Sequence, residues 1–363
     1  MGLWKNAAPR SSTLPIAPQA RFALRSPTPH SEAPLSRPHV LVTGGAGFIG
    51  GHVVARLLEL GAQVTVIDDL STGLLERLPE HELLRTVVGD MTEGTGWARA
   101  WQGEQPITRV LHLAGHVGVR RVLGDPDGCA NSHRAMAASL VSTLRAMDPE
   151  SRPGLIAASS SEVYRASQQP LSEDSTVWES SDAGWGEGRW AYAASKLRAE
   201  QSFVEAGLEV LNLRLFNVVG PGQNAESGMV LPRFVEAARL GETLQVFGSG
   251  TQVRTFGHVS CVASDLAELC LREAMPQGVL NLGGTATTQI GALARTVLTE
   301  ANLSVKLLRQ VDPAQELGPD FEEVLHRVPD LDRARALGLV NEPWSLIEIV
   351  RDAWSRHGVP SPT

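Results

Sequence analysis

The stretch His39-Val-Leu-Val-Thr43, continued by Gly44-Gly-Ala-Gly47-Phe-Ile-Gly50 and by the run His52–Leu60, decides the fold of this chain. Its first residues are a short apolar run typical of a buried strand, and the run after Gly50 has the apolar spacing of a helix. A glycine-rich turn in this position lets the backbone approach a pyrophosphate, whose charge is met by free N–H groups at the helix start. The stretch therefore predicts a strand–turn–helix unit that binds a dinucleotide.

Similar apolar runs continue to alternate with helix-length segments as far as Pro221. Strands that alternate with helices pair in parallel, so the sequence predicts an α/β fold with a doubly wound parallel sheet of the Rossmann type. The expected strands are His39–Thr43, Val64–Asp68, Thr86–Val88, Val110–Leu113, Leu155–Ser159 and Val210–Leu215.

The pattern changes after Pro221 and predicts a smaller C-terminal α/β lobe. A lobe packed over the sheet edge places a cleft at the carboxyl ends of the strands, where open α/β sheets bind ligands. We expect a disordered extension over 1–37, a mainly NAD-type dinucleotide-binding domain with the catalytic residues over 38–220, and a mainly substrate-binding lobe over 221–363. The lobe's expected elements are helices at 230–239, 261–273, 291–301, 331–336 and 345–354 and strands at 244–247 and 279–282.

Composition and charge narrow the class of protein. The chain has 363 residues, 42% of them hydrophobic, which is enough for a sizeable core. Its formal net charge of -8 reflects an excess of acidic over basic residues, so we expect no nucleic-acid partner and no binding to an anionic membrane. No apolar run has the length of a membrane span, and Cys129, Cys261 and Cys270 have neither metal-ligand spacing nor a disulfide count. These features predict a globular enzyme without a metal, located in a reducing cytoplasm.

Acidic and small residues at the strand ends specify the predicted cofactor. Asp68 ends the second strand, where a carboxylate accepts both hydroxyls of a ribose. Because Asp69 follows and no arginine stands beside it, a 2'-phosphate would be repelled, so the sequence predicts NAD rather than NADP. His112 lies inside an apolar pattern and is predicted to be a packed core residue. The expected cofactor-binding residues are Gly44, Gly47, Phe48, Ile49, Gly50, Asp68, Asp69, Asp90, Met91, Leu113 and Ala114, together with Tyr192 and Lys196.

Both tyrosines of the chain, Tyr164 and Tyr192, lie in motifs. Tyr192-Ala-Ala-Ser-Lys196 places a phenol and an ammonium four residues apart, on one face of a predicted helix. A neighbouring ammonium favours the phenolate, so we expect Lys196 to lower the pKa of Tyr192. Tyr192 is the predicted base that takes a substrate hydroxyl proton while hydride leaves the same carbon, and Lys196 is expected to hold the nicotinamide ribose as well.

The order of these motifs resembles that of the extended short-chain dehydrogenase/reductases over residues 39–356. After the glycine turn and the acidic strand end come His112-Leu-Ala, Ser159-Ser-Ser-Glu-Val-Tyr164, the Tyr192–Lys196 motif and Leu213-Arg-Leu-Phe-Asn217. This family includes nucleotide-sugar 4-epimerases, 4,6-dehydratases and UDP-glucuronate decarboxylases. The resemblance implies a nucleotide-diphosphate sugar as substrate, its transient oxidation at C4 with tightly bound NAD, and a homodimer formed through helices at 131–147 and 192–206.

The resemblance also implies roles for residues outside the Tyr192–Lys196 motif. Ser160 matches the family's catalytic Ser or Thr, which hydrogen-bonds the reacting C4 oxygen. Glu162, with Ser161 before it, matches the glutamate of dehydratases and UDP-glucuronate decarboxylases.

Three further positions match residues that hold the nucleotide diphosphate in the family. They are Asn217, Arg254 in Gly248-Ser-Gly-Thr-Gln-Val-Arg254, and Arg327 in His326-Arg-Val-Pro-Asp330. An arginine offers bidentate donors to phosphate oxygens, and Arg327 also suits a C6 carboxylate.

The sequence leaves several reactions open. Glu162 favours a 4,6-dehydratase or UDP-glucuronate decarboxylase, because epimerisation needs no acid or base beyond those of C4 oxidation. A UDP-glucose or UDP-glucuronate 4-epimerase with a solvated or salt-bridged Glu162 is one alternative. A net dehydrogenase or reductase that exchanges free cofactor, and a non-catalytic NAD-sensing protein on the same fold, are the others.

Several positions set this chain apart from the family pattern. The insert at 168–189 carries Trp178 and Trp185 just before the predicted catalytic Tyr192, and we expect it either to cover the sugar or to shield its own loop from solvent. Arg165, Val219 and Ser260-Cys261 replace residues usual in the family and suggest an unusual substrate.

Overall fold

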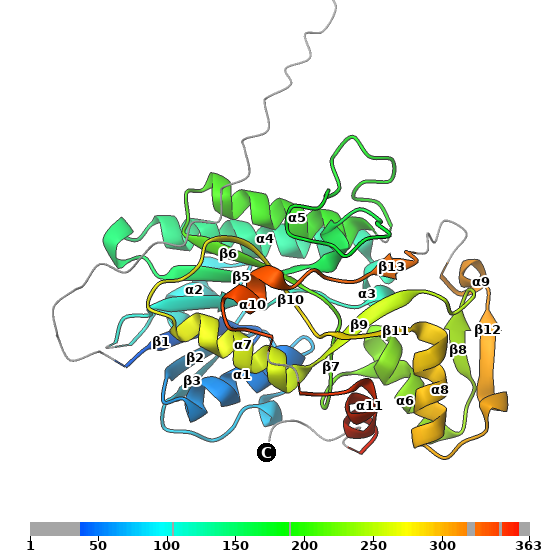
Figure 1. The fold of residues 1–363 in the computed structure, drawn as a ribbon. Coiled ribbons are helices and arrows are strands. Elements are labelled where there is room, and N and C mark those ends of the chain that lie inside the picture. The colour runs from blue at the N-terminus through cyan, green and yellow to red at the C-terminus, as the bar shows by residue number, and fades with distance from the viewer. Residues whose placement is uncertain (1–36, 104, 189, 318–323, 341–342, 356–363) are drawn as a thin grey trace, which may run out of the picture.

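The computed structural model describes residues 37–103, 105–188, 190–317, 324–340 and 343–355, so most of the expected extension over 1–37 lies outside the described residues. Within them, a parallel sheet of seven strands lies at the centre, in the order β10-β6-β5-β4-β1-β2-β3 (Figure 1). The α/β fold with a doubly wound parallel sheet is confirmed. The strands are β1 (His39–Thr43), β2 (Gln63–Asp68), β3 (Leu84–Val88), β4 (Arg109–His112), β5 (Gly154–Ser160), β6 (Val210–Leu215) and β10 (Gly278–Leu282).

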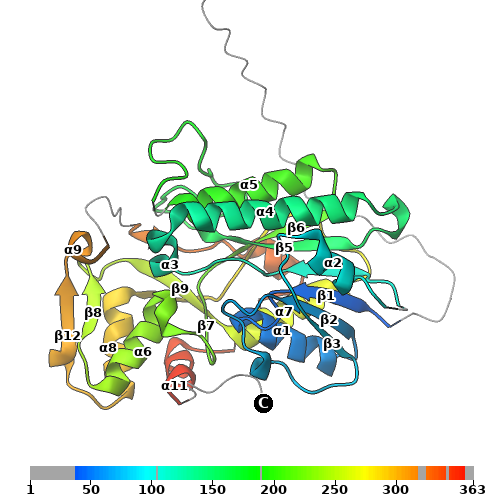
Figure 2. The ribbon, with the colours of Figure 1, turned by 180° about the vertical axis from the view of Figure 1, so that it is seen from behind.

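Helices cover both faces of this sheet (Figures 1 and 2). Among the described residues, no helix has the length and apolar character needed to cross a membrane. On one face lie α1 (Phe48–Glu59) and α7 (Val259–Leu271), and on the other lie α2 (Gly94–Ala100), α4 (Pro126–Arg145) and α5 (Trp190–Glu205).

The two faces of the sheet form two apolar cores. Val40 and Val42 of β1 pack with α1 and α7, whereas Leu41 between them packs with α4 and with Phe203 of α5. Because successive side chains of a strand point to opposite faces, both faces of β1 must be apolar to be buried. This explains why the strands read as continuous apolar runs rather than as alternating ones.

The strand register brings several carboxyl ends to one edge. Thr43 at the end of β1 lies level with Ile67 of β2 and with His112 of β4. The turns that follow these strands, at Gly44, Asp68 and Leu113, are therefore neighbours, and they are the turns that carry the expected cofactor-binding residues.

A C-terminal lobe with two small sheets lies beyond this edge (Figure 1). Its core holds Phe234, Phe256, Leu293 and Ile349. One small sheet pairs β9 (Val253–His258) with β7 (Val218–Val219), β11 (Ala286–Gln289) and β13 (His326–Arg327), and the other pairs β8 (Leu244–Phe247) with β12 (Leu308–Val311). The helices of the lobe are α6 (Val230–Leu240), α8 (Ile290–Glu300), α9 (Pro313–Leu317) and α11 (Leu346–Ser355).

The segment from α7 to β10 differs from the sequence expectation, which placed it in the C-terminal lobe. β10 pairs with β6 as an edge strand of the main sheet, and Leu266 of α7 and Leu280 of β10 join the core that contains Val42. Residues 221–363 therefore contribute to both the lobe and the main sheet. Apolar pattern identifies a helix and a strand, but not which of two sheets they join. The remaining short helices are α3 (Val119–Gly124), α10 (Asp332–Ala336) and 3-10 turns at Leu75–Arg77, Pro149–Ser151, Ser161–Val163, Ala225–Ser227 and Val305–Leu307.

Candidate active site

The glycine turn after β1 is closely packed and accepts only glycine at two positions. Gly44 has a φ of +69°, and a Cβ there would lie 2.8 Å from the backbone nitrogen of Ala114. A Cβ on Gly50 would overlap the Gly44 carbonyl oxygen. Gly47 directly precedes α1, whose half-buried Phe48 and Ile49 form the first turn. The glycine turn therefore leads directly into a helix N-terminus, the arrangement that suits a pyrophosphate.

The Asp68 carboxylate is tied to this turn. Its Oδ2 accepts a hydrogen bond from the Ala46 N–H at 3.0 Å, and its Oδ1 accepts one from the Leu70 N–H at 2.9 Å. Asp68 is buried, and burial raises its pKa above the ordinary value. Asp69 is exposed, and its Oδ1 accepts from the Ser71 N–H at 2.9 Å. A carboxylate in the place expected for ribose recognition is thus present, and it also stabilises the glycine turn.

Arg77 is a neighbour of Asp68 that the sequence did not reveal. Its buried guanidinium donates to the carbonyl oxygens of Ala46 at 3.3 Å and of Gly222 at 2.8 Å, and its charge lowers the pKa of Asp68. No arginine adjoins Asp68 in the sequence, as expected, but the folded chain brings Arg77 close to it. Both contacts direct Arg77 to the backbone, so it links the glycine turn to the loop after β7.

The other expected cofactor-binding residues lie at the ends of β3 and β4. Asp90 is exposed, and its Oδ1 accepts from the Thr92 N–H at 2.7 Å, whereas Met91 is buried. The Ala114 N–H donates to Thr43 Oγ1 at 3.2 Å, and Leu113 beside it is half buried. All of them border the same edge of the sheet as the glycine turn.

His112 is a core residue, as the sequence predicted. Its Nδ1 lies 2.8 Å from Thr43 Oγ1, and its ring contacts Phe203 edge to face. Complete burial lowers its pKa to about 3, and the charge of Lys196 lowers it further in the same direction. His112 is therefore neutral over the physiological range.

Tyr192 and Lys196 lie on one face of α5, as predicted. The Lys196 ammonium donates to the Ala158 carbonyl oxygen of β5 at 3.0 Å and lies 6.0 Å from the centre of the Tyr192 ring. Lys196 is only 7% exposed, and burial lowers its pKa to about 8.

The pKa of Tyr192 departs from expectation. Burial raises it above the ordinary value, the negative charge of Glu162 raises it further, and a hydrogen bond with Ser160 lowers it. The expected lowering by Lys196 is not found, because the Lys196 ammonium turns to the Ala158 carbonyl instead of the phenol. The hydrogen bond does bring Ser160 and Tyr192 together, as a shared role at one substrate oxygen requires.

Glu162 and Arg327, 165 residues apart in sequence, form an ion pair at this site. Arg327 Nη1 lies 3.0 Å from Glu162 Oε1, and the side chains are 7% and 23% exposed. Ser160 Oγ accepts from the Glu162 N–H at 3.2 Å and so begins the short helical turn of Ser161, which is itself buried. The structure therefore gathers Ser160, Glu162 and Arg327 around Tyr192, and the sequence indicated each of them but not their pairing.

Asn217 and Arg254 converge on β9. Arg254 is the register partner of Arg327, and its guanidinium donates to the carbonyl oxygens of Val253 at 2.8 Å and Val324 at 2.7 Å. The Asn217 amide donates to the Thr255 carbonyl oxygen at 2.9 Å. The three residues expected to hold a diphosphate thus come from three segments that meet on this small sheet.

His133 of α4 is a neighbour of the catalytic candidates that the sequence analysis missed. Its Nε2 accepts from the His116 N–H at 2.9 Å, and its Nδ1 lies 2.7 Å from Ser195 Oγ. Since Ser195 Oγ donates to the Tyr192 carbonyl oxygen at 2.8 Å, Nδ1 carries the proton and donates to Ser195. Burial and then the charge of Lys196 hold the pKa of His133 well below its ordinary value. A neutral imidazole thus supports the first turn of α5, and no spacing in the sequence signals it.

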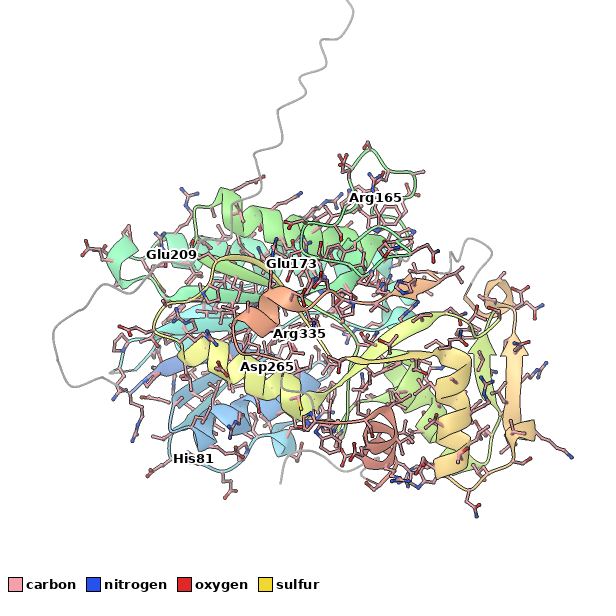
Figure 3. The ribbon with its side chains drawn as sticks, viewed as in Figure 1. His81, Arg165, Glu173, Glu209, Asp265 and Arg335 are labelled. Carbon is pink, nitrogen blue, oxygen red and sulfur yellow. The ribbon has the colours of Figure 1, made fainter. Side chains whose placement is uncertain are left out.

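The tryptophans of the insert pack near the start of α5. The rings of Trp178 and Trp190 lie 4.6 Å apart, in a cluster with Ala193 and Val324. Arg165, labelled in Figure 3, forms an ion pair with Asp182 across the insert at 2.7 Å. Arg165, one of the departures from the family pattern, therefore helps to hold the insert in place.

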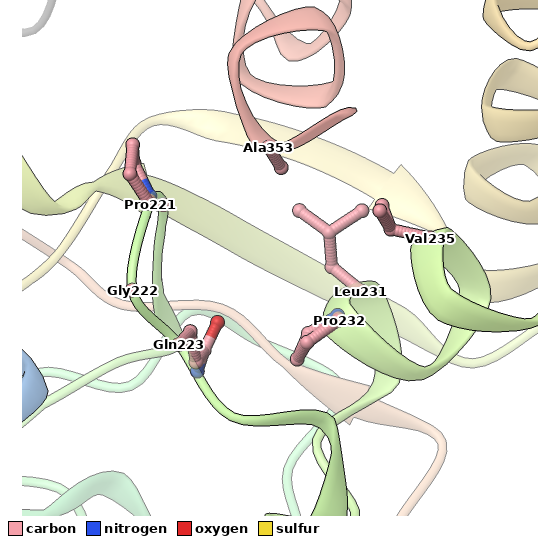
Figure 4. Close-up of a pocket in the computed structure, with 8 residues that line it drawn as sticks. Pro221, Gly222, Gln223, Leu231, Pro232, Val235 and Ala353 are labelled. Carbon is pink, nitrogen blue, oxygen red and sulfur yellow. The ribbon is translucent and has the colours of Figure 1, made fainter. Parts of the chain in front are cut away.

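A small cavity lies apart from these residues, where the loop after β7 faces α6 and α11 (Figure 4). None of the predicted catalytic residues lines it. Its lining residues are Gly220, Pro221, Gly222, Gln223, Leu231, Pro232, Val235 and Ala353.

The chain belongs to the NAD dependent epimerase/dehydratase family, whose model matches residues 40–302. This confirms the resemblance, the prediction of an enzyme and the prediction of NAD as its cofactor. The residues present fit that cofactor, because the glycine turn, packed too closely on its own backbone to accept a Cβ, leads into the N-terminus of α1 and Asp68 stands where a ribose is recognised.

Among characterised proteins, the chain is similar to sugar-nucleotide decarboxylases. It is 29% identical over 304 residues to UDP-glucuronic acid decarboxylase 1 of Xenopus tropicalis, covering 79% of this chain and 66% of that protein. It is 28% identical over 317 residues to the UDP-N-acetyl-alpha-D-glucosaminuronate decarboxylase of Bacillus cytotoxicus, covering 82% of this chain and 90% of that protein.

Solved structures share the fold at lower identity. A UDP-glucose 4-epimerase of Thermotoga maritima matches with a TM-score of 0.74 and 24% identity, over 88% of this chain and 98% of that one. A dTDP-glucose 4,6-dehydratase of Bacillus anthracis matches with a TM-score of 0.72 and 18% identity, over 89% and 97%. The Rossmann-type fold is therefore confirmed by structures of both kinds.

Proposed function

We propose that this enzyme decarboxylates a nucleotide-diphosphate hexuronate, such as UDP-glucuronate, by transient oxidation at C4. The observation that carries the proposal is the Glu162–Arg327 ion pair beside Ser160 and Tyr192. A guanidinium at this place can bind a C6 carboxylate, and epimerisation has no use for an added acid and cation there. The similarity to decarboxylases supports the same choice.

The proposed reaction has two stages, and the first is oxidation at C4, which is followed by loss of carbon dioxide. Tyr192 takes the proton of the C4 hydroxyl, with Ser160 hydrogen-bonded to the same oxygen and Lys196 on the same face of α5. NAD, when bound, accepts the hydride of C4 and later returns it. Since C4 is then a ketone, the C6 carboxylate belongs to a β-keto acid, whose C5–C6 bond breaks with release of carbon dioxide and formation of an enolate.

The second stage restores the hydroxyl. The enolate takes a proton at C5, C4 regains its hydride, and Tyr192 returns its proton to the C4 oxygen. One proton from solvent is consumed per carbon dioxide released, and the cofactor is unchanged overall. Arg327 is placed to orient the carboxylate for departure, and Glu162 is placed to govern protonation at C5.

Asn217 and Arg254 are proposed to hold the diphosphate, from the same small sheet as Arg327. This arrangement would set the distance between the diphosphate and the reacting carbons. The position of Asn217 two residues after β6 supports the proposal, because β6 is the strand next to the one that ends in Ser160.

The test is mass spectrometry of the purified enzyme incubated without added cofactor. Separate reactions contain UDP-glucuronate, UDP-glucose, UDP-GlcNAc, dTDP-glucose or GDP-mannose. We expect UDP-glucuronate to lose carbon dioxide and the Tyr192→Phe variant to leave it intact. Loss of water from a neutral sugar would make the protein a 4,6-dehydratase, and an isomer of unchanged mass would make it a 4-epimerase.

We also propose a homodimer in the cytoplasm. The long helices α4 and α5 lie side by side over one face of the sheet (Figure 2), and they contain most of the segments through which the family resemblance implies dimerisation. Light scattering of the purified chain tests the dimer, and a mass of one chain would contradict it. Imaging of the tagged full-length chain tests the location.

A further inference from the structure

A row of buried polar residues crosses the sheet beneath the candidate site. Ser159 of β5 lies level with Arg214 of β6, and Arg214 lies level with Asn281 of β10. Residues level with one another on neighbouring strands point to the same face. All three are buried, and Asn281 is completely so.

The row joins the sheet to the helix that carries Lys196. Arg214 donates to both carboxylate oxygens of Glu200, at 3.1 and 2.7 Å, and Ser159 donates to Glu200 as well. Glu200 is one helical turn beyond Lys196 on α5. The Arg214 guanidinium also lies 4.7 Å from the centre of the Tyr164 ring. Ser159 and Arg214 therefore form a base for the Tyr192–Lys196 face of α5, whereas Asn281 has other partners.

Asn281, at the end of the row, has every polar group of its side chain in use. Its Oδ1 accepts from the Tyr164 hydroxyl at 2.7 Å. Its Nδ2 donates to the carbonyl oxygens of Leu171 at 2.8 Å and Asp330 at 3.2 Å. These partners fix the orientation of the amide, because only the nitrogen can donate to two carbonyls.

The partners of Asn281 belong to the two segments that form the Glu162–Arg327 pair. Tyr164 follows Glu162 by two residues, and Asp330 follows Arg327 by three. One buried amide thus joins the segment that carries the carboxylate to the segment that carries the guanidinium.

The segment after Arg327 is also held by backbone hydrogen bonds and by an ion pair. β13 is only two residues long, and beyond it the Leu171 N–H donates to the Val328 carbonyl at 2.8 Å and the Asp330 N–H donates to the Leu171 carbonyl at 2.8 Å. The Leu171 carbonyl is the same one that accepts from Asn281. The backbone N–H of Asn281 also donates to Glu173 at 2.9 Å, and Glu173, labelled in Figure 3, contacts Arg333 of α10 at 3.5 Å.

We propose that Asn281 is a positioning residue that holds Arg327 against Glu162 and thereby governs the step after C4 oxidation. The inference rests on the proposed function. Asn281 touches neither Tyr192 nor Lys196 in its hydrogen bonds, so its loss leaves the first stage with its machinery in place. The segment that carries Arg327 loses one of its anchors, and a displacement of about 1 Å is enough to lower the rate of a chemical step about 100-fold.

The experiment compares Asn281→Asp and Tyr164→Phe with the unaltered enzyme in single turnovers of UDP-glucuronate. Asn281→Asp keeps the shape of the side chain but cannot donate to the two carbonyls. Tyr164→Phe removes one hydrogen bond and keeps the ring against Arg214. Two readouts are followed: the near-ultraviolet absorbance of reduced nicotinamide, which reports C4 oxidation, and the mass of the sugar nucleotide products.

We expect C4 oxidation to stay within about threefold of the unaltered rate, a factor worth less than 1 kcal/mol. Formation of the decarboxylated sugar nucleotide should fall at least about tenfold in Asn281→Asp, with reduced nicotinamide persisting and 4-keto sugar nucleotide released. Tyr164→Phe should give the same change in product partition to a smaller degree.

Asn212→Leu is the matched control. Asn212 lies on β6, is also buried, and has no hydrogen-bond partner for its Oδ1 among the described residues. Its replacement should alter the melting temperature but not the ratio of decarboxylated sugar nucleotide to released 4-keto sugar nucleotide. An unchanged partition in folded Asn281→Asp or in Tyr164→Phe overturns the inference, as does an equal loss of both stages. If the unaltered enzyme releases no carbon dioxide, the proposed function fails instead, whatever the variants do.

Discussion

Replacing Glu162 by Gln tests the two-stage reaction most directly, because it removes one charge and keeps the shape of the side chain. The geometry of the ion pair indicates how much folding stability this replacement removes. The Glu162–Arg327 distance is 3.0 Å, and the side chains of Arg327 and Glu162 are 7% and 23% exposed. The contribution of this partly buried pair to stability therefore lies between that of a surface pair, at most about 1 kcal/mol, and the loss on breaking a buried pair, about 3–5 kcal/mol. A loss of about 2 kcal/mol corresponds to a fall of about 3 °C in melting temperature for a protein of this size. The Glu162→Gln protein therefore remains folded under assay conditions.

The effect on the first stage has a defined sign. The negative charge of Glu162 raises the pKa of Tyr192, so its removal lowers that pKa. Tyr192 acts as a base, and more phenolate is present at a given pH when its pKa is lower. The rate of C4 oxidation, which rises with pH, should rise at a lower pH in Glu162→Gln than in the unaltered enzyme.

The second stage should fail in the same variant. We expect decarboxylated product to form at least about 100-fold more slowly, the loss typical of a group that transfers a proton. Stopped-flow absorbance of reduced nicotinamide across a pH series measures the first stage, and product mass measures the second. Glu268→Gln, which breaks an exposed ion pair with Arg272 on α7, is the control. Unaltered product formation in Glu162→Gln, or a shift of the oxidation profile to higher pH, would refute the reasoning.

Three other replacements probe the neighbouring residues. Tyr192→Phe should abolish turnover while NAD still raises the melting temperature, and measurable turnover would remove Tyr192 from the mechanism. Lys196→Met should remove a pH dependence of stability. Burial lowers the pKa of Lys196 from 10.5 to about 8, so between pH 8 and pH 10.5 the unfolded chain holds a proton that the folded chain has released. The free energy of unfolding of the unaltered enzyme therefore rises across this pH range, by up to about 3 kcal/mol. Chemical denaturation at pH 7 and pH 10 compares this rise in the two proteins, and an equal rise in both would contradict it. His133→Leu should lower turnover about tenfold by removing the donor to Ser195. His39→Leu, at the start of β1 and away from the catalytic candidates, is its control and should change only the melting temperature.

Much of the nucleotide-binding half could be predicted because its signals are local. The apolar runs gave the six strands from β1 to β6 at nearly their observed positions, and the glycine turn fell between β1 and α1 as expected. Tyr192 and Lys196 share a helical face because a separation of four residues fixes this in any helix. Such predictions depend on backbone geometry over a few residues, so they survive without knowledge of the tertiary structure.

The electrostatic environment of the same residues could not be predicted. The sequence suggested that Lys196 lowers the pKa of Tyr192, but the ammonium turns to Ala158, and burial together with Glu162 raises that pKa instead. Desolvation and charge act through space, and the groups that cause them come from β5, α5 and the turn after β5. The positions of His133 beside Ser195 and of Arg77 beside Asp68 could not be predicted for the same reason.

By itself, the sequence determined the α/β fold class, the family and the preference for NAD, and it supplied the candidates for the reacting side chains, since each follows from a motif whose parts are close in the chain. Only the tertiary structure decided that β10 closes the main sheet, that Arg327 reaches Glu162, and that Asn281 joins the segments of both. These contacts connect residues 49 to 165 positions apart. They are selected by the packing of whole layers against one another, and no local pattern encodes that packing.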